Sequence, residues 1–132
     1  MGSRIIVKEW FERGGKDLAD AEFLFKHNRA LETVSFLAQQ SAEKYLKGYL
    51  IFKGRELERT HDLVKLLQDA VDLDSDFSGF VTMAKTVTNF YFEGRYPMGY
   101  PVDFTKEEIR QSLSWVRKLV KVIKGKTRSR QT

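Results

Sequence analysis

Apolar residues recur every three or four positions along most of the chain, which is the spacing of one face of an α-helix. This pattern predicts helices over residues 7–27, 30–53 and 77–92, one that begins at Thr60 and one that begins at Thr105. No stretch alternates apolar and polar residues for long enough to form a sheet. We therefore predict an all-α fold, an up-and-down bundle of four to five helices with short connections.

The ends of the predicted helices carry local signals. Gly54 is suited to follow the second helix, because the left-handed backbone that often ends a helix favours glycine. Thr60 is predicted to cap the third helix, which would place His61 in the first helical turn. Thr105 and Glu108 have the spacing of a capping box at the start of the last helix.

The second predicted helix is apolar on two sides. One side includes the small residues Ala38, Ser41 and Ala42, which allow another backbone to approach closely. A helix of this kind is either central in a bundle or shared with a second subunit. In the first helix, Gly14 and Gly15 predict either a weak point or a close contact with another helix.

Length and composition limit the classes of protein and of site. The 132 residues suffice for one domain, and we assign residues 1–124 to a single helical domain and 125–132 to a basic C-terminal tail. The absence of cysteine excludes disulfides and thiolate metal sites. The two histidines, His27 and His61, are far apart in the sequence, so we expect neither a metal site nor a cofactor.

Hydropathy gives an expectation for localisation. No apolar run approaches the roughly 20 residues of a membrane span. The N-terminus lacks the basic start and apolar block of a signal peptide. We therefore expect a cytoplasmic protein with no membrane partner.

The net charge of +5 is unevenly distributed. Residues 109–132 contain eight lysines and arginines and no acid, whereas the remaining 108 residues contain 15 cations and 18 acids. Basicity therefore belongs to the C-terminal end of the chain. Such an end can attract phosphates, and the alternative is a solvated terminus with no ligand.

Three sequence segments together resemble one known family. They are FLAQQSAEKYLKGYL in the second predicted helix, THDL at the start of the third, and YFEGRYP at the end of the fourth. In this order they resemble the HEPN domain (higher eukaryotes and prokaryotes nucleotide-binding domain) of small free-standing prokaryotic proteins. The early segment KDLADAEFLF fits the first helix of that family, so the resemblance covers roughly residues 7–123.

The resemblance implies a helical bundle that acts as a homodimer and binds nucleotide or RNA. Many HEPN proteins are metal-independent ribonucleases, toxins or RNA-processing factors, and others bind nucleotides or partner proteins without catalysis. Small prokaryotic members are often paired with a minimal nucleotidyltransferase in a toxin–antitoxin-like module. We therefore expect nucleotide or RNA as a ligand and a nucleotidyltransferase as a possible partner.

The ribonuclease members carry an arginine, four to six residues and then a histidine. Arg55 and His61, with five residues between them, fit this spacing, although Glu56 stands where the family usually has a small polar residue. His61 would serve as the base and Arg55 or Arg95 as the clamp on the phosphate. The structural alternatives are that His61 orients the corner between two helices and that Arg95 forms a buried salt bridge to Glu43.

Further residues are candidates for nucleotide or RNA binding. These are Lys44 and Lys47 on the second helix, together with Arg95 and Tyr96 in the Gly/Pro-rich loop. The lysines and Arg95 would meet phosphates, and Tyr96 would stack on a base. The alternative for Lys47 is an ion pair with Glu43 one helical turn away.

Three functional hypotheses follow. The first is a HEPN protein that binds nucleotide or RNA in a nucleotidyltransferase-associated or toxin–antitoxin-like module. The second is a metal-independent ribonuclease with a histidine base and an arginine phosphate clamp. The third is a non-catalytic protein–protein interaction module. An exposed histidine in a cleft would favour the enzyme, and an apolar patch without positive charge would favour the interaction module.

Overall fold

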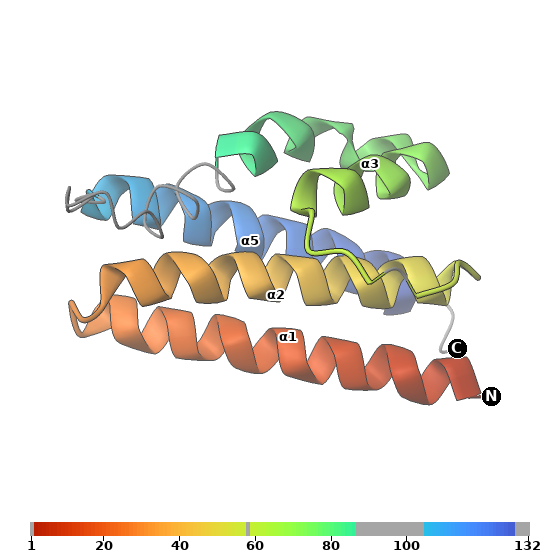
Figure 1. The fold of residues 1–132 in the computed structure, drawn as a ribbon, viewed down its shortest axis with the longest axis horizontal. Helices are drawn as coiled ribbons and strands as arrows, with labels where there is room; N and C mark the ends of the chain where they lie inside the picture. The colour runs from red at the N-terminus through yellow and green to blue at the C-terminus, as the bar shows by residue number, and fades with distance from the viewer. Residues whose placement is uncertain (1, 58, 87–104, 129–132) are drawn as a thin grey trace.

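The computed structural model describes residues 2–57, 59–86 and 105–128 (Figure 1). Its elements are α1 (Gly2–Lys26), α2 (Leu31–Phe52), α3 (Leu63–Leu73), the 3₁₀ helix η1 (Ser75–Phe80) and α5 (Lys106–Arg128). Residues 81–86 continue as α-helix after η1. The described residues contain no β-strand, and the predicted all-α bundle is confirmed.

Helix α2 is the central element of the bundle. It packs against α1, α3 and α5, and α1 runs antiparallel beside it (Figure 1). The core around it includes Tyr49, Leu46 and Phe77, all fully buried. The two apolar sides of α2 are therefore explained within one chain, because different helices cover them.

The contact between α1 and α2 is close, because glycines lie where the helices meet. A Cβ atom added at Gly14 would lie 2.7 Å from the ring of Tyr45, and one at Gly48 would lie 2.6 Å from the ring of Phe11. The hydroxyl of Ser41 donates a hydrogen bond of 2.8 Å to the backbone carbonyl of Gly14. Helix α1 continues through Gly14, so the glycine pair marks a close helix contact, one of the two predicted alternatives.

Two predicted helix ends are confirmed. Gly54 has a φ of 88°, and the N–H groups of Gly54 and Arg55 donate to the carbonyls of Ile51 and Leu50. This is the double hydrogen-bond pattern of a Schellman motif, which satisfies the last carbonyls of α2. At the start of α5, Thr105 Oγ1 accepts from the N–H of Glu108, and the Glu108 carboxylate accepts from the N–H of Thr105.

The predicted cap of the third helix is wrong. Asp62 is the N-cap of α3, and its carboxylate accepts a 3.1 Å hydrogen bond from the N–H of Lys65. Thr60 Oγ1 instead accepts from the N–H of Asp62, one step outside the helix. Both side chains can cap a helix, but the ionised carboxylate is the stronger acceptor and also suits the positive end of the helix dipole. His61 therefore precedes α3 and does not belong to its first turn.

The fourth predicted helix differs in its first turns. Residues 75–80 form η1, in which the Asp74 carboxylate accepts from the N–H of Asp76, and α-helix follows from residue 81. Short polar side chains that bond to nearby N–H groups favour such tight turns over an α-helix. Residues 87–92 of the predicted helix lie outside the described residues.

The last helix extends into residues 125–132, which we assigned to the basic tail. Helix α5 continues to Arg128, and Thr127 within it is buried. The ammonium group of Lys126 lies 2.6 Å from the carboxylate of Asp74 and 2.7 Å from that of Asp76. These contacts lower the pKa of Asp74 and attach the end of α5 to the turn between α3 and η1.

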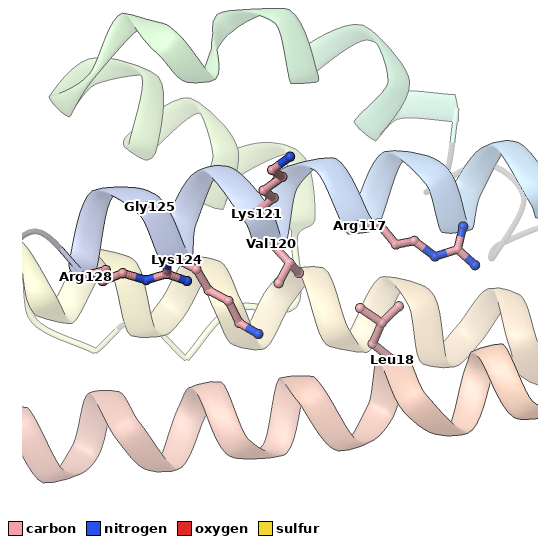
Figure 2. Close-up of a pocket in the computed structure, with 7 residues that line it drawn as sticks. All are labelled: Leu18, Arg117, Val120, Lys121, Lys124, Gly125 and Arg128. Atoms are coloured by element: carbon pink, nitrogen blue, oxygen red, sulfur yellow. The ribbon is translucent and has the colours of Figure 1, made fainter.

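A groove remains between α1 and α5. Both helices pack on α2 rather than on each other. The groove has a volume of about 370 Å³, and most of its lining side chains come from α5 (Figure 2).

Candidate functional site

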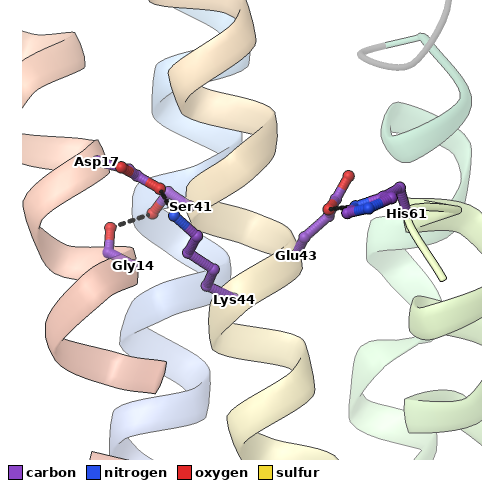
Figure 3. Close-up of polar contacts among 6 residues, drawn as sticks. All are labelled: Gly14, Asp17, Ser41, Glu43, Lys44 and His61. Carbon is purple, nitrogen blue, oxygen red and sulfur yellow. Dashed lines mark hydrogen bonds and ion pairs between the residues drawn. The ribbon is translucent and has the colours of Figure 1, made fainter. Parts of the chain in front are cut away.

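His61 and Glu43 lie in contact although 18 residues separate them in the sequence. His61 Nδ1 is 3.3 Å from Glu43 Oε2 (Figure 3). The side chain of His61 is 81% exposed, whereas that of Glu43 is only 3% exposed. A solvent-facing imidazole is therefore held from behind by a buried carboxylate.

The local structure on both sides of this pair explains its position. Glu43 lies near the middle of the long helix α2, which is fixed by packing on three sides. After α2 ends, residues 54–57 and 59–62 turn back along that helix (Figure 1). Asp62 then caps α3, so that His61 is anchored immediately before a helix start.

The environment of Glu43 is unusual for a carboxylate. Burial raises its pKa, while the hydrogen bond from His61 and the charges of His61 and Lys47 lower it, and burial dominates. Glu43 Oε1 is buried without a hydrogen-bond partner among the described residues. The contact with His61 is therefore the principal compensation for a buried acid.

The side of α2 that carries Glu43 includes further buried polar side chains. Ser35, Gln39 and Glu43 follow one another at four-residue intervals along α2 and are all less than 5% exposed. Each carries a buried oxygen without a hydrogen-bond partner within the described part of the chain. Lys47 is 7% exposed, and its ammonium group lies 5.4 Å from the centre of the Trp10 ring.

The two lysines proposed for phosphate binding have other contacts. Lys44 Nζ lies 2.6 Å from Asp17 Oδ2, on the side of α2 that faces α1 (Figure 3). Figure 3 places this pair on the opposite side of α2 from Glu43 and His61. Lys47 contacts Trp10 rather than forming the predicted ion pair with Glu43. The structure does not bring Lys44 to His61.

The arginine candidates differ in what the structure shows. Arg55 is exposed, and its backbone N–H donates to the carbonyl of Leu50. Within residues 2–57 and 59–86, no hydrogen bond or ion pair joins Arg55 to His61. Arg95 and Tyr96 lie outside the described residues, as does any contact between Arg95 and Glu43.

Two other kinds of feature are absent from the described residues. No group of three or more histidine, aspartate or glutamate side chains there is arranged to hold a metal ion. No helix among those residues is both long enough and apolar enough to cross a membrane.

The chemistry of the pair follows from its geometry. When Glu43 is ionised it can only accept, so Nδ1 of His61 must carry the proton of their hydrogen bond. In the neutral ring the other nitrogen, Nε2, then presents a lone pair. An exposed imidazole in this tautomer is able to accept a proton from a ligand hydroxyl.

His61 was predictable from the sequence, but its partner was not. We expected Glu43 to pair with Arg95 or Lys47, since both are reasonable ion-pair partners by type. The partner depends on how the segment after α2 folds back, which is a tertiary feature with no local signal. Glu43 was recognisable only as one acid among the residues of α2.

Comparisons with known proteins agree with the fold. The HEPN domain family model matches residues 7–126. The crystal structure of ST0689, an archaeal HEPN homologue, superposes with a TM-score of 0.71 at 26% identity, covering 92% of this chain and 97% of that one. The crystal structure of TT1696 from Thermus thermophilus gives a TM-score of 0.75 at 26% identity, covering 91% of this chain and 97% of that one. No curated protein sequence matches the chain. Because the family model spans most of its length, this chain belongs to the HEPN domain family.

Proposed function

We propose that this HEPN protein binds RNA and cleaves it without a metal ion, with His61 as the general base. The observation that carries the proposal is the exposed imidazole of His61, held at Nδ1 by the buried carboxylate of Glu43. Burial of the carboxylate fixes the direction of the ring and selects the tautomer in which Nε2 is free to accept a proton. General-base catalysis requires a basic atom of this kind within hydrogen-bond reach of the proton that it takes.

In the proposed reaction, Nε2 of His61 takes the proton from a ribose 2′-hydroxyl. The 2′-oxygen then forms a bond to the adjacent phosphorus, and the bond from phosphorus to the 5′-oxygen breaks. The departing 5′-oxygen takes up a proton from water, and His61 returns its proton to the solvent. The products are a 2′,3′-cyclic phosphate and a free 5′-hydroxyl. Glu43 touches no reacting atom, and its part is to position His61.

An arginine would stabilise the charge that gathers on the phosphate. Arg55 is a candidate because it belongs to the same segment between α2 and α3 as His61. Arg95 remains a candidate from the sequence resemblance alone. Substituting each arginine with lysine in turn would assign the clamp, since lysine keeps the charge but loses the two-pronged contact with phosphate.

The second candidate function is binding of nucleotide or RNA without cleavage. The observation that favours it is the absence, within the described part of the chain, of an arginine in contact with His61. An imidazole without a neighbouring cation can bind a phosphate when protonated but lacks a partner for the charge that develops during cleavage.

The proposal includes a homodimer, the assembly common among HEPN domains. Ile5 and Ile6 on α1 and Leu57 after α2 are each at least 45% exposed. Figure 1 shows the start of α1 and the end of α2 at the same end of the bundle, which would give a second copy an apolar surface. Light scattering should give twice the mass of the chain, and Ile6→Glu should lower it. A nucleotidyltransferase partner in a toxin–antitoxin-like module stays a prediction from the resemblance.

The test of the proposed reaction is incubation of a mixed-sequence RNA with the protein in excess EDTA. A second reaction contains the same sequence as 2′-O-methyl RNA, which lacks the hydroxyl that must lose its proton. The proposal predicts cleavage of the first RNA only, with 2′,3′-cyclic phosphate ends. An uncut RNA that the protein nevertheless binds would establish the second candidate, and cleavage of the methylated RNA would contradict the mechanism.

A further inference from the structure

Three cations of α5 line the groove between α1 and α5. They are Lys121, Lys124 and Arg128, all exposed, and Gly125 lies among them (Figure 2). No salt bridge to a carboxylate joins any of the three within the described residues. Figure 2 shows Lys124 and Arg128 on the side of α5 that faces α1, whereas the ammonium group of Lys121 points away from α1. Positive charge is therefore concentrated in a concave surface without local neutralisation.

Other cations of the same helix are already neutralised. Arg117 Nε lies 2.8 Å from Glu22 Oε1 of α1, which closes one end of the groove with an ion pair. Lys126 is bound to Asp74 and Asp76. The helix thus contains both structural cations and cations that remain available to a ligand.

The groove has an apolar floor. Leu18 from α1 and Val120 from α5 contribute aliphatic surface between the charged side chains. The ammonium group of Lys124 lies 5.8 Å from the centre of the Tyr45 ring, which belongs to α2. A ligand that fits must therefore combine negative charges with weakly polar parts between them.

We propose that this groove binds the phosphodiester backbone of single-stranded RNA. Lys121 and Arg128 are seven residues apart, which is about 10 Å along the helix axis. This length accommodates a few consecutive phosphates of a single strand. Riboses and bases provide the weakly polar parts that would lie on Leu18 and Val120. The choice of RNA among polyanions rests on the proposed function.

The groove is separate from the candidate catalytic pair. It lies where α1 and α5 flank α2, whereas His61 contacts α2 beside the start of α3. The groove would hold the RNA, and the chemistry would take place elsewhere on the protein. Binding and cleavage are therefore separable by experiment.

The experiment measures affinity for a labelled 20-nucleotide 2′-O-methyl RNA, which the proposed reaction cannot cut, at several salt concentrations. The groove variant carries Lys121→Gln, Lys124→Gln and Arg128→Gln. The matched control carries Lys16→Gln, Lys85→Gln and Lys106→Gln, which removes the same charge from positions outside the groove. Circular dichroism confirms that both variants are folded.

We expect the groove variant to bind at least about tenfold more weakly at 0.1 M salt, while the control stays within about threefold of the wild type. The negative slope of log K against log salt concentration should become less steep by about 2 in the groove variant. Three phosphate contacts are lost, and each contributes about 0.7 to the slope. Equal losses in both variants would overturn the proposal, since binding would then follow net charge alone.

Further outcomes separate this inference from the proposed function. If the wild type cuts unmodified RNA and His61→Ala does not, but the groove and control variants bind alike, the groove assignment fails and the proposed enzyme stands. If the groove variant loses binding and no RNA is cut, the enzyme fails and the groove stands. Binding of anionic lipid vesicles through the groove, with no effect on RNA, would overturn the choice of ligand.

Discussion

His61 and Glu43 form a pair in which one partner faces water and the other is buried. Their atoms Nδ1 and Oε2 are 3.3 Å apart, and Glu43 is fixed in the most constrained helix of the bundle. A buried acid is costly unless something compensates for it, and here the compensation comes from a side chain that is itself exposed. The hydrogen bond that compensates for the burial of Glu43 is therefore the same one that orients the imidazole of His61.

The first prediction concerns the stability of Glu43→Gln. Burial raises the pKa of Glu43, so the folded protein binds this proton more tightly than the unfolded chain. The stability of the wild type therefore falls as the pH rises from the unfolded value of 4.5 through the raised pKa. Glutamine cannot ionise but still accepts from His61. Urea denaturation should show the variant to be more stable than the wild type at pH 7, with a smaller difference below pH 4.5.

The control for this prediction is Glu9→Gln, an exposed glutamate on α1. Its denaturation midpoint should follow that of the wild type across the pH range. If Glu43→Gln were instead the less stable protein at pH 7, the charged contact with His61 would outweigh the cost of burial.

The second prediction concerns the start of α3. Asp62→Ala should lower the free energy of unfolding by about 1 kcal/mol, because it removes the acceptor for the N–H of Lys65. Thr60→Ala should have a smaller effect, since its hydroxyl accepts only the N–H of Asp62 outside the helix. Urea denaturation of both variants decides the matter. A larger loss for Thr60→Ala would mean that the helix begins earlier than observed.

These helix ends show what local sequence determines. The capping box of Thr105 and Glu108 and the glycine at Gly54 were predictable, because each motif satisfies backbone groups with residues only a few positions away. Thr60 and Asp62 are both good caps within one short segment. The carboxylate of Asp62 is the stronger acceptor and suits the helix dipole, a local preference that the prediction of Thr60 did not weigh.

The candidate site shows the limit of sequence reasoning more clearly. His61 was recognisable by its type and by the resemblance to HEPN proteins. The contact of His61 with Glu43 was not, because it depends on how the residues after α2 fold back along that helix. The groove between α1 and α5 was not predictable either, because it forms only where two helices far apart in the sequence flank α2.

The third prediction concerns the contact between α1 and α2. Gly48→Ala should destabilise the protein by about 1–3 kcal/mol, because the added methyl group would lie 2.6 Å from the ring of Phe11. Gly125→Ala is the matched control, since it is also in a helix but has nothing within 4 Å of the added Cβ. It should stabilise the protein by up to about 1 kcal/mol through helix propensity. Thermal denaturation of both variants tests this, and a gain for Gly48→Ala would contradict the close packing.

The central claim is that His61 is the base of a metal-independent ribonuclease. The most direct test is the rate of RNA cleavage in excess EDTA by His61→Ala, with His27→Ala as the control. His27 is the other histidine of the chain and is exposed beside Phe23 at the end of α1. We predict that His61→Ala is at least about 100-fold slower than the wild type, because a general base typically contributes that much or more. We predict that His27→Ala cuts at the wild-type rate. Cleavage by His61→Ala at the wild-type rate would contradict the claim.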